Sequence, residues 1–360
     1  MAGRGVHHGS KQIDGEQGEI GEKGEIIMNR SKTGLFQFFQ AVTLATLVLI
    51  TAWGAAARAT AEGSFDRALK VTGEVNLSVS TGSGHITVRK GSAGAVSIHG
   101  IIRASHGHMS DQEAEQKVRA LEQNPPISQE GDVIRIGNVG DSDLQRNISI
   151  SYEITTPEET KLRSETGSGG ATIAGIRGPI EASTGSGGMS IENTGAEVTA
   201  STGSGGIDLH NIKGNLHAST GSGSISGSGL GGAVTAGTGS GSIRIEDNGA
   251  GDFDVHTGSG TIEVSGVKGS LRARTGSGNI EARGEQTGEW RLHTGSGNVT
   301  VKLPQNAAFD LQAQTSSGDI HTDRPITVQG TIGRHELRGK VGAGGPLLDL
   351  STSSGSIRIE

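Results

Sequence analysis

The sequence contains no cysteine, and aromatic residues make up only 2% of its 360 residues. Without cysteine the chain can form no disulfide, no thiolate nucleophile and no metal site with cysteine ligands. Its formal net charge is −7, and its lysines and arginines are scattered along the chain. Binding to nucleic acid requires a basic stripe that displaces counterions, so we expect no nucleic-acid partner.

Motifs that mark common enzymes are also missing. The sequence has no Gly-Lys-Ser/Thr phosphate loop, no G-x-S-x-G nucleophile elbow and no H-E-x-x-H zinc pair. A polysaccharide-cleaving enzyme would need clustered carboxylates, and Glu263 and Glu281 on adjacent repeats are the nearest candidates. Acidic and basic residues alternate around them, so we interpret this face as solvated. We therefore predict no enzyme, no cofactor, and no catalytic, cofactor-binding or metal-binding residue.

What the sequence has in abundance is glycine, with 62 residues, many of them in one repeated motif. Thr-Gly-Ser-Gly begins at Thr81, Thr166, Thr184, Thr202, Thr220, Thr238, Thr257, Thr275 and Thr294, and Thr-Ser-Ser-Gly begins at Thr315 and Thr352. From Thr166 to Thr294 the step is 18 residues five times and 19 residues twice. A period this regular indicates stacked coils, none of which can bury its own apolar residues alone.

Each repeat is predicted to contain two short strands. Apolar residues occupy alternate positions after the motif and again before the next one, which is typical of strands with one buried face. We expect the motif glycines to serve a corner that needs positive φ or close backbone approach, and the motif Thr and Ser to form inward hydroxyl ladders. The large residues Phe253, Trp290 and Phe309 fall on inward positions and are interpreted as core packing.

The predicted fold is all-β: a single-stranded β-solenoid, or β-helix, of about ten coils of 18 residues over residues 166–360. After Asp319 the repeat pattern loosens, and it recovers at Leu347. The last strand pair is expected to form a C-terminal cap that covers the open end of the stack.

Residues 62–165 are predicted to form a small β-rich lead-in domain with one α-helix near 111–123. A capping box from Ser110 to Glu113 begins the helix, and Pro125-Pro126 ends it. We expect the helix to pack one face on the strands and to cover an end of the array. Before it, His106-Gly107-His108 lies close to Asp111 and Glu113, but two histidines at this spacing are more typical of a polar loop than of a metal site.

The first part of the chain predicts export. Residues 1–27 are predicted to form a disordered polar tail, which is not translated if Met28 is the true start. Residues 28–61 combine basic residues, an apolar run from Phe38 to Trp53 and a small-residue end, Ala59-Thr60-Ala61. This order is typical of a secretory signal peptide. The alternative is an uncleaved anchor that tethers the protein through residues 35–57. Both place the remainder in the periplasm, at the cell surface or on the outer face of the cytoplasmic membrane.

The order of these elements resembles a known family. A leader, short strands and one capped helix precede Ile150-Ser151-Tyr152-Glu153-Ile154-Thr155-Thr156-Pro157, which leads into coils of the form T-G-S-G-x-I-x-I. The chain then ends with a further strand pair from Leu347 to Ile359. Residues 65–360 are in this way similar to the bacterial putative-adhesin β-solenoid domains. The resemblance implies an extracytoplasmic β-solenoid and brings no catalytic residues.

The predicted function is that of a non-enzymatic, exported cell-envelope β-solenoid, an adhesin or a surface binding or scaffold protein. Its partner would be an envelope glycan or protein that the sequence does not identify. The main alternative is an envelope-stress or signalling accessory that binds a membrane protein. Two further hypotheses are a polysaccharide-active enzyme and, if the threonine ladder faces outward, an ice-binding protein.

Overall fold

The computed structural model describes residues 61–105, 109–137, 142–246, 251–328 and 333–360. All of them lie in one compact unit, which is built from two long sheets. The predicted polar tail (residues 1–27) and, except for Ala61, the predicted leader or anchor (residues 28–61) lie outside the described residues. Neither helix within the described ranges has the length and apolar character that crossing a bilayer requires.

The first sheet, sheet A, contains 14 strands. In spatial order they are β1 (Glu62–Lys70), β4 (Ala95–Ala104), β7 (Ile148–Thr156), β3 (Ile86–Lys90), β9 (Ala171–Ala174), β11 (Met189–Thr194), β13 (Ile207–Ile212), β15 (Ile225–Leu230), β17 (Ile243–Glu246), β19 (Ile262–Val267), β21 (Ile280–Gly284), β23 (Val299–Lys302), β29 (Ile357–Ile359) and β25 (Ile320–Thr322).

The second sheet, sheet B, contains 15 strands. In spatial order they are β26 (Ile326–Thr327), β27 (Glu336–Val341), β24 (Phe309–Ser317), β28 (Leu347–Ser354), β22 (Trp290–Ser296), β20 (Leu271–Ser277), β18 (Phe253–Thr257), β16 (Val234–Thr238), β14 (Leu216–Thr220), β12 (Val198–Thr202), β10 (Ile180–Thr184), β8 (Thr160–Thr166), β2 (Val75–Thr81), β6 (Val133–Ile136) and β5 (Ile127–Glu130).

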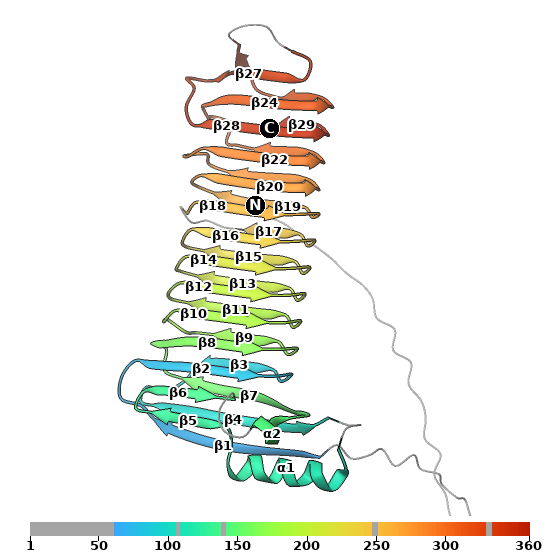
Figure 1. Cartoon of the computed structure of the whole chain (residues 1–360). Helices are drawn as coiled ribbons and strands as arrows, with labels where there is room; N and C mark the ends of the chain where they lie inside the picture. Colours follow the sequence, from blue (N-terminus) through green and yellow to red (C-terminus); the bar gives the residue numbers. More distant parts are fainter. Residues whose placement is uncertain (1–60, 106–108, 138–141, 247–250, 329–332) are drawn as a thin grey trace, which may run out of the picture. The chain divides into compact units, whose positions relative to one another are not determined.

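The repeats form the predicted β-solenoid. Each coil gives one strand to each sheet, and successive coils lie on one another as parallel strands (Figure 1). The pairing keeps the sequence period, because Val198 lies opposite Leu216 in sheet B and Ile207 opposite Ile225 in sheet A. Like side chains therefore stack on like, and the alternate apolar positions of both strands are buried between the sheets.

The motif threonines from Thr166 onward are buried, Thr81 is half-buried, and these side chains join neighbouring coils through hydrogen bonds. The Thr202 hydroxyl donates to the carbonyl oxygen of Gly187 in the preceding coil (3.0 Å) and accepts from the amide of Gly205 (3.1 Å). The same pair of bonds is made by Thr220 and the glycines around it. The expected inward ladder is thus confirmed for threonine, although the acceptor is a backbone carbonyl.

The motif serines, by contrast, are exposed, so an inward serine ladder was a wrong expectation. The glycines of the motif allow the backbones of neighbouring coils to approach closely at the corner. A Cβ atom on Gly187 would lie 2.0 Å from the carbonyl oxygen of Gly169, far inside van der Waals contact. Of the two expected reasons for glycine here, close approach is the one that applies to this coil.

The large aromatic residues belong to the core, as predicted. Trp290 and Phe309 are 0% exposed and Phe253 is 2% exposed. The indole nitrogen of Trp290 donates to the carbonyl of Gly269 at 2.9 Å, which satisfies its polar group inside the stack. These rings are therefore unavailable for stacking on a ligand.

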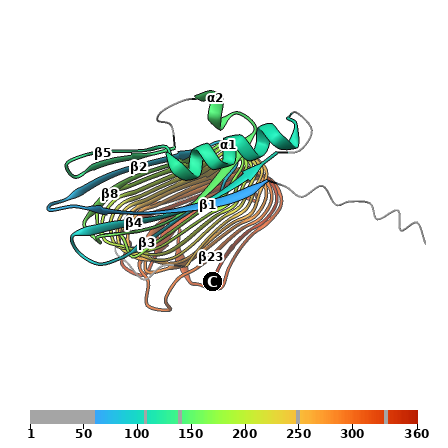
Figure 2. The ribbon, with the colours of Figure 1, turned by 90° about the horizontal axis from the view of Figure 1, so that it is seen from below.

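A helix covers one end of the stack. Helix α1 (Asp111–Gln123) begins at Ser110, whose hydroxyl accepts from the Glu113 amide (3.2 Å), as the capping box predicted. Its buried residues Ala114, Val118 and Leu121 face β1 and β4, and Figure 2 shows the helix lying across the end strands. A single helical turn, α2 (Ser142–Gln145), lies beside α1 and was not predicted.

The strands of residues 62–165 continue the two sheets of the repeats. Strand β2 pairs in parallel with β8, which places Thr81 opposite Thr166, and β3 pairs with β9. The coil formed by β2 and β3 therefore lies between β6 and β7 on one side and β8 and β9 on the other. The earliest copy of the motif is therefore a coil of the same stack.

The last strand pair does not cover the open end, so that expectation was wrong. Strand β28 lies between β22 and β24, and β29 lies between β23 and β25. The segment from Leu347 to Ile359 retains alternate inward apolar residues and a motif threonine, so both of its edges can pair with coils. The intervening segment has lost that pattern. Its strand β27 instead covers the edge of β24 in antiparallel pairing, and β26 pairs antiparallel with β27.

Candidate functional site

The outer face of sheet A carries a column of polar side chains, one from each strand. In spatial order it comprises Asp66, His99, Glu153, Thr87, Thr172, Ser190, Asp208, Ser226, Arg244, Glu263, Glu281, Thr300, Arg358 and His321, which we call the A column. Neighbouring members come from adjacent strands, which lie about 4.8 Å apart. Strand register alone therefore builds a regular polar face.

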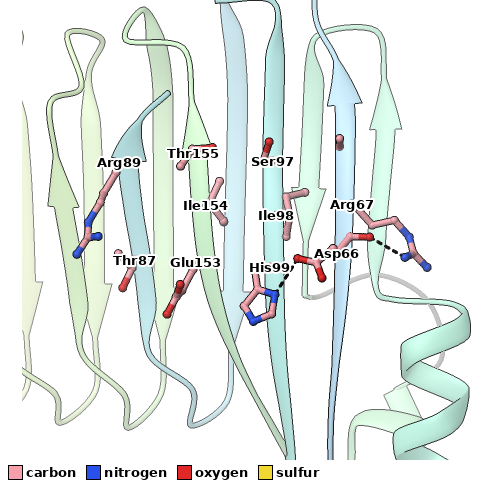
Figure 3. A pocket seen from close by; sticks show the side chains of 11 residues that line it. Asp66, Arg67, Thr87, Arg89, Ser97, Ile98, His99, Glu153, Ile154 and Thr155 are labelled. Carbon is pink, nitrogen blue, oxygen red and sulfur yellow. Dashed lines mark hydrogen bonds and ion pairs between the residues drawn. The ribbon is translucent and has the colours of Figure 1, made fainter. Parts of the chain in front are cut away.

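A depression of about 530 Å³ lies over this face near the helix-covered end. It is lined by side chains from β1, β4, β7 and β3, four neighbouring strands of sheet A (Figure 3). Asp66, His99, Glu153 and Thr87, the first four members of the A column, cross it in that order. The sequence does not reveal this group of residues, because the four strands that carry them are not separated by a constant number of residues.

The strongest polar contact in this depression joins its histidine to a carboxylate. His99 Nδ1 lies 2.8 Å from Asp66 Oδ1, and the Asp66 side chain is 82% exposed. A polar contact so open to solvent contributes little to stability. Figure 3 shows Glu153 on the other side of His99 and Arg89 beyond it. The depression thus offers both acidic and basic groups to a polar partner.

The carboxylates considered for polysaccharide cleavage are engaged by basic side chains. Glu263 and Glu281 lie opposite each other in register, but Glu263 pairs with Arg244 at 2.9 Å. Glu281 accepts hydrogen bonds from Arg283 and lies 3.3 Å from Lys302. Hydrogen bonding from Arg283 holds the pKa of Glu281 below its usual value, so this carboxyl is ionised at neutral pH. A general acid needs the opposite shift.

Two other hypotheses can be compared with the structure. The ice-binding hypothesis required an outward threonine ladder, and the motif threonines are buried, so that condition is not met. For the metal hypothesis, His106 and His108 lie outside the described residues. In the part of the chain that the structure describes, no group of three or more His, Asp or Glu side chains could hold a metal ion.

Comparison with known proteins places the chain in a family. A family model described as Toastrack DUF4097 matches residues 70–360. The chain belongs to this Toastrack family. The match begins at the last residue of β1 and includes the coil of β2 and β3 as well as the final inserted strand pair. No curated protein matches the chain.

Solved structures with a likeness to this Toastrack chain have low sequence identity. A putative cell adhesion protein from Clostridium sporogenes is 12% identical, over 82% of this chain and 99% of that chain, with a TM-score of 0.21. A putative adhesin from Bacteroides fragilis is 12% identical, over 83% and 97%, with a TM-score of 0.29. One from Parabacteroides distasonis is 9% identical, over 83% and 97%, with a TM-score of 0.23. The family assignment rests on the match to the family model.

Proposed function

We propose that the protein is a non-enzymatic, exported component of the cell envelope that binds an extended surface polymer through the outer faces of its sheets. The observation that carries this proposal is the A column, an unbroken series of outward polar side chains in strand register. A face that repeats with every coil suits a partner that is itself long and repetitive, as a polysaccharide is.

The filled interior supports the same proposal. The inward positions of the coils are occupied by buried aliphatic side chains, by buried threonines and by the aromatic rings of the C-terminal half. Small-molecule enzymes usually hold their substrate in a concave, mostly apolar pocket. Here the apolar side chains are used for packing between coils, and the outer faces remain for contact with a partner.

The export part of the proposal is supported by the sequence of residues 28–61, which has the order of a secretory leader. The protein would then act in the periplasm, at the cell surface or on the outer face of the cytoplasmic membrane. The absence of catalysis is supported by the paired carboxylates of sheet A, since the hydrogen bond from Arg283 favours the charged form of Glu281.

The proposal can be tested by applying the purified protein to arrays of cell-wall fragments and glycans, and by measuring surface attachment of a deletion strain. We expect saturable binding to at least one polysaccharide class and weaker attachment without the gene. A blank array together with unaltered attachment would refute the proposal. Capture of a defined membrane protein from solubilised membranes, with a blank array, would instead favour the signalling accessory.

A further inference from the structure

A second depression, of about 480 Å³, lies on the outer face of sheet B. Its lining comprises His256, Thr257, Arg274, Thr275, Gly276, His293 and Gly295, from strands β18, β20 and β22. The three basic side chains belong to one outward column, because His256 pairs in register with Arg274, and Arg274 with His293. We call these three residues the basic triad.

The first histidine of the triad, His256, packs over Gly237 of the preceding strand, β16. A Cβ atom on Gly237 would lie 2.6 Å from both Cε1 and Nε2 of His256, so the imidazole ring occupies the space above this glycine. The three coils before it carry serine at the corresponding position, at Ser183, Ser201 and Ser219. The change from serine to glycine at this coil thus makes room for the ring.

The second histidine is held from the opposite side. His293 Nδ1 lies 2.7 Å from the hydroxyl of Ser351 on β28, the strand beyond β22. His256 therefore contacts the strand before the triad, and His293 contacts the strand after it. In strand register, Arg274 lies between the two histidines. The inserted C-terminal strand supplies one of these two supports.

Among the described residues, the central arginine has only a distant carboxylate as partner for its charge. Arg274 Nη2 lies 3.6 Å from Asp254 Oδ1, and the same carboxylate lies 3.7 Å from Arg272. Both separations exceed ordinary hydrogen-bond length, so one carboxylate is shared by two guanidinium groups without a close contact to either. The Arg274 side chain is 54% exposed, and Arg274 is among the residues that line the depression.

Other exposed arginines on the same sheet are more fully paired. Arg163 contacts Glu165 at 2.6 Å and Glu181 at 3.1 Å. In the neighbouring column of the triad region, Arg291 contacts Glu289 at 2.8 Å and lies opposite Asp349. None of these four acidic residues is among the residues that line the depression.

We propose that the basic triad binds the carboxylate or sulfate groups of an acidic envelope polysaccharide. This inference rests on the proposed function and names the class of polymer and the place of contact. A guanidinium group donates two parallel hydrogen bonds to a carboxylate or a sulfate, and the flanking imidazoles add donors on both sides. The column direction runs along the stack, so a chain lying on sheet B could place anionic groups over successive coils.

The test measures binding of the full chain to dextran sulfate, polygalacturonate and unmodified dextran by biolayer interferometry. We expect binding to one or both acidic polymers, and none to dextran. Arg274→Gln should weaken that binding roughly tenfold, since it removes a charged hydrogen-bond donor. Gly237→Ser should also weaken binding, because its Cβ would displace the His256 ring. Arg163→Gln removes the same charge from the same sheet and should leave affinity within about twofold.

The outcomes separate the two proposals. If the protein binds no polymer on this panel or on the glycan arrays and attachment of the deletion strain is unaltered, both proposals fail. If it binds a glycan on the arrays but no acidic polymer, only the triad proposal fails. If it binds dextran as tightly as dextran sulfate, or if Arg274→Gln binds like the unaltered chain, the triad proposal fails and the proposed function stands. Equal losses in Arg274→Gln and Arg163→Gln would also overturn it, since they would indicate non-specific attraction. Matching circular dichroism spectra of all variants confirm that each is folded.

Discussion

The buried threonine column can be tested by one substitution, Thr202→Val, which keeps the side-chain shape and removes the hydroxyl. The hydroxyl is the donor to the Gly187 carbonyl (3.0 Å) and the acceptor for the Gly205 amide (3.1 Å). Without it, two backbone groups at the corner lose this partner. A buried polar group left unsatisfied costs about 1–3 kcal/mol.

Both glycines are half-buried, so water can compensate in part. We therefore expect Thr202→Val to lower the free energy of unfolding by roughly 2–3 kcal/mol, near the lower end of the sum for two groups. Thr202→Ser keeps the hydroxyl and loses only one methyl group, which should cost about 1 kcal/mol. Ser204→Ala changes an exposed motif serine and should stay within about 0.5 kcal/mol of the unaltered protein.

The assay is urea unfolding followed by circular dichroism, with the slope of the transition compared among the variants. Repeat arrays can unfold in steps, so hydrogen exchange at the Gly205 amide provides a local measurement. We expect this amide to be protected in the unaltered protein and in Thr202→Ser, and to exchange faster in Thr202→Val. Equal stability and equal protection in Thr202→Val and Ser204→Ala would refute the role assigned to the threonine column.

Three further predictions concern the corner, the inserted strand pair and one ion pair. Gly187→Ala places a Cβ 2.0 Å from the Gly169 carbonyl oxygen and should cost about 3 kcal/mol or more in urea unfolding; a change below 1 kcal/mol would contradict the close-approach explanation. Deleting residues 347–360 removes β28 and β29 and leaves unpaired edges on β22 and β24, so size-exclusion chromatography should show self-association; a stable monomer would be the opposite result. Arg283 lowers the pKa of Glu281 in the folded protein, so the contribution of this ion pair to stability is present above the pKa that Glu281 has in the unfolded chain and is lost as the pH falls through its folded-state pKa. Glu281→Gln should therefore lower the melting temperature at pH 7 and have no effect in strong acid. An equal effect at both pH values would contradict this reasoning.

The basic triad could have been found from the sequence, but only by comparing residues one coil apart. His256, Arg274 and His293 are separated by 18 and 19 residues, the step of the motif itself. The charged residues considered from the sequence follow the motif and face outward on sheet A. The residues of the triad precede the motif and lie on sheet B. That His256 lies over Gly237 and that His293 contacts Ser351 depends on contacts between strands, which a step along the chain does not reveal.

The sequence by itself determined the elements that depend on local pattern. The constant step and the alternate apolar positions predict stacked strand pairs, because side chains of a strand alternate between its two faces. The capping box at Ser110 predicts where α1 begins, because its hydroxyl bonds an amide three residues later.

Only the tertiary structure decided the order of the coils at the ends of the stack. The segment from Leu347 to Ile359 has the same inward pattern as the coils on both of its sides, so its sequence fits equally well at an end or between two coils. Its place is decided by competition for strand edges. The patternless segment before it pairs antiparallel, with β24 and within itself, and the regular pair therefore occupies the position that has a parallel strand on each side. That competition involves segments distant in the chain, and no local pattern records its outcome.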